Sequence, residues 1–280
     1  MTRKREVVVG IDGSDTSAAA AAWAAGEAHA RGATLVVLYS FELYAYGSKD
    51  AALPGSIPYE EAQIAAAELV DGVVKQLGHE RGGLRIEPRI LHESAGTALL
   101  EASAEALLTV VSSHGHSART EELIGSFAVH TAEHGLGPVA VVRVPAPGTG
   151  PIVVGADGSA VSDNAIDYAF AAAHAHRVPL HVVHCAHGSD EDRGLTDLEG
   201  ALADRRAAHP DVEVVTAVEA GKPQHALLDY AAARDAGQLV VGSRGVSGFA
   251  GIVLGSVSRS LLANSSIPVV VVRPEAEPAG

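Results

Sequence analysis

Residues 152–159 read IVVGADGS, and residues 7–14 open the chain with nearly the same pattern, VVVGIDGS. The two segments are identical at six of eight positions. In each segment an apolar run, typical of a buried strand, ends at aspartate, glycine and serine, which are typical of a turn or a helix start. The repetition predicts that one strand-first structural unit occurs twice in the chain.

Two further matches follow in the same order: VVSSHG at 110–115 with VVGSRG at 240–245, and PVAVVRV at 138–144 with PVVVVRP at 268–274. Three ordered matches indicate a duplication. The offset between the copies falls from 145 to 130 residues, so the first copy has extra residues, chiefly in the segment 42–58. We expect a first domain at 1–147 and a second at 148–280, with their boundary in the proline- and glycine-rich segment 144–151.

Apolar strand-like runs alternate with alanine-rich helical segments in both copies. The predicted strands are 6–11, 34–41, 85–91, 107–112 and 138–143, then 152–156, 180–185, 212–218, 239–242 and 268–273. The helical segments of the second copy are about 160–176, 191–208, 222–236 and 255–265. Continuous apolar strands separated by helices indicate a parallel sheet covered on both faces. We therefore expect an α/β protein of two tandem doubly wound domains, each with a five-stranded parallel sheet in the order 3-2-1-4-5.

The composition excludes several classes of partner. The chain has 34 acidic and 20 basic residues, and phosphate-backbone binding needs a concentrated positive surface, so nucleic acid is not expected. No apolar run approaches the ~20 residues that span a bilayer, and no signal-peptide pattern is present, so we expect no membrane association and a cytoplasmic location. The single cysteine, Cys185, excludes an intramolecular disulfide and fits a reducing compartment.

In the order 3-2-1-4-5 the first and fourth strands are neighbours, and ligands bind beyond their carboxyl ends. Asp157, Gly158 and Ser159 follow the first strand of the second copy, and GSRG at 242–245 follows the fourth. Glycine lets backbone N–H groups approach a ligand, and a helix N-terminus presents unpaired N–H groups to an anion. A phosphate site is one interpretation; a flexible glycine loop, with Asp157 or Ser159 as a helix cap, is the other.

Gly242, Gly245, Gly255 and Ser256 form G-x2-G-x9-G-S, which resembles the ATP-binding signature of the universal stress protein family. The V-G-x-D-G-S and P-V-x-V-V-R segments are also similar to the first and last strands of that family, so the resemblance covers nearly the whole chain. It implies that ATP is bound, with Mg²⁺ as a candidate accompanying ion, that Asp157 lies on the adenosine side, and that main chain near Cys185 contacts adenine. Arg244 is a candidate source of positive charge, with an exposed surface arginine as the alternative interpretation. The full candidate set is Ala156, Asp157, Gly158, Ser159, Cys185, Gly242, Arg244, Gly245, Gly255, Ser256, Val257 and Ser258.

The first copy keeps the spacing of this signature but has Ser112 in place of the first glycine, and its loop carries Glu121 and Glu122. The candidates for a weaker site there are Asp12, Gly13, Ser14, Ser40, Ser112, Gly115, Gly125 and Ser126. If Ser112 must adopt a positive φ, the cost is ~1 kcal/mol, and each carboxylate adds ~0.5–1 kcal/mol of repulsion with phosphate. The sum, roughly 2–3 kcal/mol, predicts that the first site binds about 30- to 150-fold more weakly.

Other classes of site lack their patterns. The chain has no G-x4-G-K-[ST] and no G-x-G-x-x-G after a first strand, and its last strands have Arg143 and Arg273 where a response regulator uses lysine. The fourteen histidines show no spacing that predicts a metal site, and no residues have the arrangement of a catalytic nucleophile and base. We expect neither metal nor catalytic residues.

The resulting hypothesis is a regulatory module that binds adenine nucleotide, mainly in its second copy. The alternatives are a slow ATP hydrolase or nucleotidyl-transfer enzyme on the same fold, and an interaction protein whose sites have decayed. The apolar fifth strands, near 139–142 and 269–272, are edge strands that favour pairing. By the same resemblance we expect them to pair within one chain, with a homodimer of chains as a weaker expectation.

Overall fold

The computed structural model describes residues 4–41, 59–115, 124–143, 150–186, 191–245 and 254–274, with backbone alone for 191–197. Three segments discussed above lie outside the described residues. They are the segment 42–58, positions 144–149 of the boundary segment, and the loop that contains Glu121 and Glu122.

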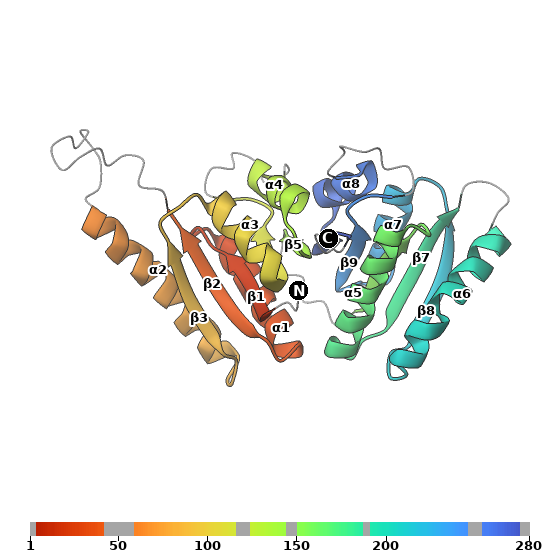
Figure 1. The fold of residues 1–280 in the computed structure, drawn as a ribbon, viewed down its shortest axis with the longest axis horizontal. Helices are drawn as coiled ribbons and strands as arrows, with labels where there is room; N and C mark the ends of the chain where they lie inside the picture. The colour runs from red at the N-terminus through yellow and green to blue at the C-terminus, as the bar shows by residue number, and fades with distance from the viewer. Residues whose placement is uncertain are drawn as a thin grey trace, which may run out of the picture.

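Strands and helices alternate through both halves of the chain (Figure 1). The elements of the first half are β1 (Lys4–Gly10), α1 (Asp15–Ala30), β2 (Thr34–Ser40), α2 (Tyr59–Glu80), β3 (Ile86–Leu91), α3 (Ala95–Glu105), β4 (Ala106–Ser112), α4 (Ser126–His134) and β5 (Val139–Val142). The elements of the second half are β6 (Ile152–Ala156), α5 (Ala160–His176), β7 (Leu180–Ala186), α6 (Glu191–Ala208), β8 (Val214–Ala220), α7 (Pro223–Ala232), β9 (Gln238–Gly242), α8 (Ser256–Asn264) and β10 (Val269–Val272).

The ten strands form one sheet in the order β3-β2-β1-β4-β5-β10-β9-β6-β7-β8. All neighbours within a half are parallel, and each half has the order 3-2-1-4-5 when its own strands are numbered. The predicted α/β fold is therefore confirmed. In both halves the first and fourth strands are neighbours, so the turns after β1 and β4, and after β6 and β9, meet at the carboxyl edge of their half.

Each face of the sheet has its own apolar core, and each core extends through both halves. Side chains alternate between the faces along a strand, so Val7 and Val9 pack on one face and Val8 on the other. The first face is covered by α1, α2, α5 and α6, and the second by α3, α4, α7 and α8. The alanines of α1 and α5 are small enough to let these helices pack closely on the strands.

The predicted element boundaries differ from the observed ones mainly at the edge of the second half. The third strand of that half was expected at 212–218, but β8 spans Val214–Ala220 because its ladder follows β7 to the pair Ala186–Ala220. The helix expected at 222–236 ends at Ala232. The apolar pattern is weak there because the residues of this edge strand are only partly buried.

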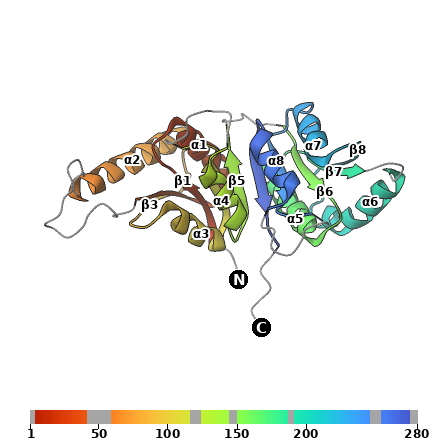
Figure 2. The same cartoon turned by 90° about the horizontal axis from the view of Figure 1, so that it is seen from above.

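The two halves join through β5 and β10, which pair antiparallel with Ala140 opposite Val270 (Figure 2). Both residues are fully buried. The predicted pairing of the fifth strands within one chain is thus observed. It removes two apolar edges that would otherwise face water.

A buried polar cluster joins the halves on the face of α1 and α5. Arg31 donates to Glu27 Oε2 through Nε (3.0 Å) and Nη2 (2.9 Å), and Nη2 also donates to the hydroxyl of Tyr168 (2.9 Å). His176 Nε2 lies 2.7 Å from Glu27 Oε1, close enough for an ion pair but not aligned as a hydrogen bond. Burial alone would raise the pKa of Glu27, but Arg31 and His176 hold it below its ordinary value. Glu27 is therefore a buried carboxylate that bridges the halves.

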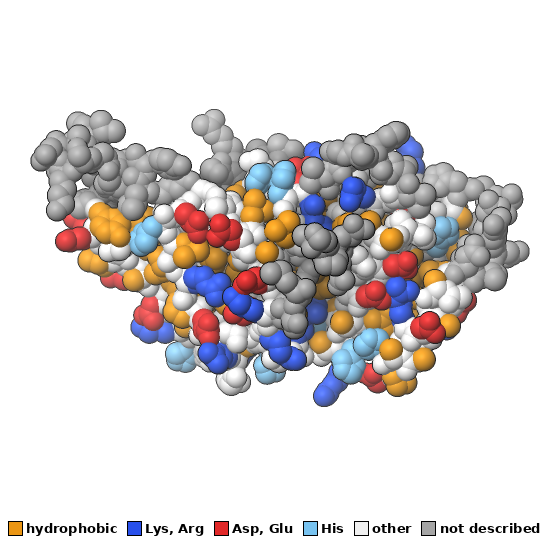
Figure 3. Space-filling model, in the orientation of Figure 1, with side chains coloured by type: hydrophobic (Ala, Val, Ile, Leu, Met, Phe, Trp, Pro, Cys, Tyr) orange, Lys and Arg blue, Asp and Glu red, His pale blue; other side chains and the backbone are white. Residues whose placement is uncertain are grey.

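Acidic and basic side chains are interspersed among the described residues on the face drawn in Figure 3, without a basic patch. None of the helices in the described part of the chain has the length and apolar character that a membrane span requires. Within the same residues, no three histidine, cysteine, aspartate or glutamate side chains are grouped as metal ligands.

Replacing Val270 by lysine should destabilise the protein by about 3 kcal/mol or more, because the ammonium group would be buried in the β5–β10 pair. Urea unfolding measures the loss, and hydrogen exchange of β5 amides shows whether the pair opens. Val218→Lys on the outer strand β8 adds the same charge to a half-buried position and serves as the control. An equal loss in both variants, with β5 exchange unchanged, would show that this pair does not hold the halves together.

Glu27→Gln should destabilise the protein by about 3 kcal/mol at neutral pH, because Arg31 would remain buried without a counter-charge. The control is Glu87→Gln, whose pair with Arg85 is exposed and is worth less than about 1 kcal/mol. Because folding lowers the pKa of Glu27, its contribution is complete above the ordinary value of 4.5 and is lost as the pH falls through the folded value. Denaturation between pH 3 and 7, about the range of carboxylate titration, checks both points; a difference that does not shrink toward low pH contradicts this account of the cluster.

Candidate functional site

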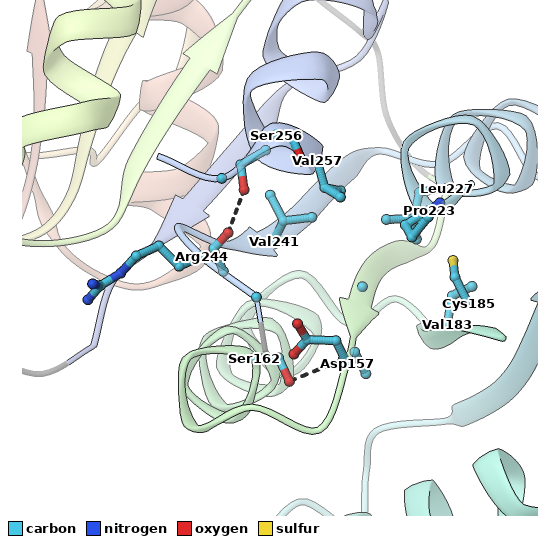
Figure 4. A pocket seen from close by; sticks show the side chains of 16 residues that line it. Asp157, Ser162, Val183, Cys185, Pro223, Leu227, Val241, Arg244, Ser256 and Val257 are labelled. Carbon is cyan, nitrogen blue, oxygen red and sulfur yellow. Dashed lines mark hydrogen bonds between the residues drawn. The ribbon is translucent and has the colours of Figure 1, made fainter. Parts of the chain in front are cut away.

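A cavity of about 560 Å³ lies beyond the carboxyl ends of β6, β7 and β9, beside the N-termini of α7 and α8 (Figure 4). Ten of the predicted site residues line it: Ala156, Asp157, Cys185, Gly242, Arg244, Gly245, Gly255, Ser256, Val257 and Ser258. The order of strands therefore brings residues that follow the first strand of the second copy and residues that follow its fourth strand to one cavity. The other lining residues, which the sequence analysis missed, are Gly155, Ser162, Val183, Pro223, Leu227 and Val241.

Gly158 and Ser159 build the turn after β6 and do not line the cavity. Gly158 has φ +78°, a left-handed conformation that favours glycine. Ser159 caps α5 by accepting from the backbone N–H of Ser162 (3.2 Å). Asp157 Oδ1 accepts from the backbone N–H (3.0 Å) and the hydroxyl (2.6 Å) of Ser159, which fixes the carboxylate beside the cavity. The helix-cap interpretation is thus correct for Ser159.

Gly245 faces the Asp157 carboxylate across the cavity wall. A Cβ atom at this position would lie 2.5 Å from Asp157 Oδ2, so only glycine fits without a displacement. At Gly242 a Cβ atom would lie 3.0 Å from Val161 Cγ1 and 3.2 Å from the Arg244 carbonyl, whereas at Gly255 the nearest atom would be 3.5 Å away. None of these three glycines has a positive φ. Glycine is needed in this loop because neighbouring atoms lie close to the backbone, and they lie closest at Gly245.

The N-terminus of α8 borders the cavity without a side-chain cap. Its N-cap residue is Gly255, which has no side chain to accept from the first-turn N–H groups, and within the described residues no side-chain cap bond is made. The backbone N–H of Gly255 donates to the Ser243 carbonyl (2.8 Å), and the buried Ser258 hydroxyl donates to the Gly242 carbonyl (2.7 Å). The second bond commits the Ser258 side chain to holding the helix, and the first-turn N–H groups are the donors that a helix N-terminus presents to an anion.

A second helix N-terminus borders the same cavity. Helix α7 begins with Pro223 at its first position, and its N-cap residue Lys222 makes no side-chain cap bond. Pro223 and Leu227 line the cavity. Two helix dipoles therefore place partial positive charge on it, each equivalent to roughly half an elementary charge.

The guanidinium of Arg244 points away from the cavity in Figure 4, although its backbone lines the wall. Its positive charge, together with burial, which is the larger effect, lowers the pKa of Arg273 at the β5–β10 junction. The side chain of Arg244 thus extends toward the other half. The expectation that this side chain adds charge to the site is not supported by its orientation.

The remaining wall of the cavity is apolar, with Val183, Leu227, Val241 and Val257 among its side chains. The thiol of Cys185 adjoins this wall, and burial, with a smaller effect of Glu219, raises its pKa to about 11. It is therefore a neutral, weakly reactive thiol at pH 7. Among the described residues that line this cavity, the ionisable side chains are Asp157, Cys185 and Arg244, and the two helix N-termini and the apolar wall suit an anionic, partly apolar ligand.

The first half has an equivalent cavity of about 430 Å³. Of the predicted residues, Asp12, Ser40, Ser112, Gly115, Gly125 and Ser126 line it. Gly13, with φ +85°, and Ser14, the N-cap of α1, instead form the turn, as their counterparts do in the second half. Phe127 lines this cavity at the position that Val257 holds in the second half.

Ser112 does not have a positive φ, so the backbone penalty expected for it does not apply. Its hydroxyl donates to the His114 carbonyl (2.7 Å), to which the hydroxyl of Thr16 also donates (2.8 Å). Thr16 occupies the position of Val161, the residue that a Cβ atom at 242 would approach most closely. Ser112 and Thr16 of the first half therefore take the places of Gly242 and Val161 in the second. Hydrogen bonds from both hydroxyls to the His114 carbonyl accommodate the serine side chain.

The comparisons with known proteins cover both halves. The model of the universal stress protein family matches residues 4–143 and 148–273. A universal stress protein of Mycolicibacterium smegmatis is 31% identical over 286 residues, which cover 96% of this chain and 97% of that protein. Universal stress protein Rv2005c of Mycobacterium tuberculosis is also 31% identical, over 97% of this chain and 98% of its own length.

The fold is shared with a solved structure. The crystal structure of a universal stress protein from Archaeoglobus fulgidus superposes with a TM-score of 0.77 at 22% identity, covering 97% of this chain and 99% of that one. Family match, sequence identity over nearly the full length and shared fold agree with the resemblance seen in the sequence. The chain belongs to the universal stress protein family.

Proposed function

We propose that the chain is an ATP-binding regulatory protein in which the second-half cavity is the principal nucleotide site. The observation that carries this proposal is the combination of an uncapped α8 N-terminus with an apolar wall in one cavity of about 560 Å³. This volume is within the range of about 300–1,000 Å³ that is usual for small-molecule sites.

The chemistry of the lining suggests how ATP would lie. The N–H groups of Gly245, Ser256 and Val257 would meet the phosphates, because they lie in the loop after β9 and in the first turn of α8. Adenine would lie against the apolar wall near Val183 and Cys185. Asp157, between these two regions, would accept hydrogen bonds from the ribose hydroxyls, for which a carboxylate is a strong acceptor.

Electrostatics favours a metal-bound form of the nucleotide. The chain carries a formal net charge of −14, and the Asp157 carboxylate adjoins the site. The two helix N-termini offset only part of the repulsion with a polyphosphate. We therefore propose that Mg²⁺ accompanies ATP on its phosphates, which are its usual ligands. A cytoplasmic location and a dimer of chains stay predictions.

Gly245→Ala should weaken ATP binding at least about tenfold, equivalent to ~1.4 kcal/mol, because the new methyl group must displace the Asp157 carboxylate or the loop. Calorimetry on the folded full-length protein measures the affinity. Gly72→Ala is the matched control, because no heavy atom lies within 4 Å of a Cβ atom there. Unchanged affinity in folded Gly245→Ala would contradict the assignment of ATP to this cavity, and steady phosphate release by the unaltered protein would contradict a binding role without turnover.

The second half should bind ATP more tightly than the first. With the Ser112 penalty removed, the two carboxylates Glu121 and Glu122 leave ~1–2 kcal/mol of repulsion, or about 5- to 30-fold in affinity. Gly115→Ala and Gly245→Ala make a matched pair, since each places a Cβ atom 2.5 Å from the aspartate of its own half. Titrating each variant isolates the remaining site.

The residual affinity of Gly115→Ala should be the higher one. Protection of the single thiol, Cys185, from a maleimide by ATP gives an independent measure of the second site in the unaltered protein, with labelling at alkaline pH, where more of the reactive thiolate forms. Equal affinities in the two variants, or tighter binding in Gly245→Ala, would show that Glu121 and Glu122 do not weaken ATP binding in the first half.

A further inference from the structure

Two arginines cross the β5–β10 junction in opposite directions. Arg143 directly follows β5, and its Nη2 donates to the carbonyl of Ala263 in the last turn of α8 (2.7 Å). Arg273 directly follows β10, and its Nη2 donates to the carbonyl of Ala132 in the last turn of α4 (3.3 Å). Each half therefore supplies the arginine that holds the end of a helix in the other half.

These contacts are partly desolvated and electrostatically matched. The Nε atoms of both arginines are buried and have no hydrogen-bond partner within the described residues. Burial, more than the nearby Arg244, lowers the pKa of Arg273. The last-turn carbonyls of a helix lack intrahelical partners and carry its partial negative charge, so a guanidinium is a suitable donor for them.

The held helices are those that begin at the two cavities. Helix α8 begins at Ser256, which lines the second cavity, and α4 begins at Ser126, which lines the first. With a rise of 1.5 Å per residue, Ala263 lies only about 10 Å along the axis from the first turn of α8. A helix this short moves as a rod, so a shift of its C-terminus also displaces the N–H groups at its N-terminus.

A different contact between the same helices is partly open to water. Arg259 of α8 forms an ion pair with Glu133 of α4, in which the arginine side chain is 59% exposed and the glutamate side chain 18%. Ion pairs open to water contribute little to stability. Figure 1 shows α4 and α8 on either side of the β5–β10 junction. The Arg259–Glu133 pair therefore lies at the same junction and is a suitable comparison for the two crossing arginines.

We propose that Arg143 and Arg273 are positioning residues, each of which fixes the position of the helix N-terminus that borders the cavity of the opposite half. Arg143, which belongs to the first half, thereby positions the N-terminus of α8 at the second cavity, and Arg273 positions the N-terminus of α4 at the first. The effect on ligand affinity rests on the proposed ATP site, whereas the effect on the helices does not.

The ligand-free test is hydrogen exchange in the full-length protein. Arg143→Met keeps the length and apolar contacts of the side chain but removes the donor, and should speed exchange in α8 about tenfold while α4 is unchanged. Arg273→Met should do the reverse. Arg259→Met is the control, with little change in either helix. If a methionine variant does not fold, the glutamine variant, which is too short to reach the carbonyl, replaces it with the same expectation.

The ligand test is ATP titration of the second site in the Gly115→Ala background. There Arg143→Met should weaken binding about fivefold or more, Arg273→Met should leave it unchanged, and Arg143→Lys, which retains a donor, should recover most of the loss. If the unaltered protein binds no ATP, the proposed function fails, and hydrogen exchange still decides this inference. The inference would be overturned if hydrogen exchange changed only in the helix of the arginine's own half, changed equally in α4 and α8, or did not change in either helix.

Discussion

The antiparallel pairing of β5 with β10 joins the two halves into one sheet and organises the packing on both of its faces. Each half alone would end in a four-residue edge strand of valine and alanine, whose apolar side chains would face water and whose unpaired N–H and C=O groups favour pairing with another strand. Pairing turns two five-stranded sheets into one and lets both apolar cores extend through the junction. It also determines which helices meet, with α1 beside α5 on one face and α4 beside α8 on the other. The buried Glu27 cluster and the two crossing arginines exist only because of this pairing.

The cavities follow from the order of strands within each half. Because β6 neighbours β9, the turn that contains Asp157 meets the loop that contains Gly245, and a side chain at 245 would have to displace the Asp157 carboxylate or the loop. Glycine at 255 leaves the α8 N-terminus uncapped, whereas serine at 159 caps α5 beside it. The N-terminus of α5 is thus capped by a side chain of the protein, whereas that of α8 is not. This difference is the strongest structural argument that the N-terminus of α8 faces a ligand.

Much of this could be predicted from the sequence because the signals are local or repeated. The duplication of VVVGIDGS and the alternation of strands and helices indicated the fold, and the glycine spacing indicated most of the residues that line the cavities. Pro223 and Leu227 could not be found this way, since nothing in a helix that follows the third strand shows that its N-terminus borders the cavity. The direction of the Arg244 side chain depends on packing at the junction, and the accommodation of Ser112 depends on Thr16, which is distant in sequence. Contacts between side chains far apart in the chain were the part that local patterns could not supply.

A crystal structure of the protein grown with ATP and Mg²⁺ would show whether the second-half cavity is the nucleotide site. We expect nucleotide in the second-half cavity, with phosphate oxygens within hydrogen-bond distance of the N–H groups of Gly245, Ser256 or Val257 and adenine against Val183 and Cys185. Nucleotide found only in the first-half cavity, or phosphates placed away from the α8 N-terminus, would contradict it.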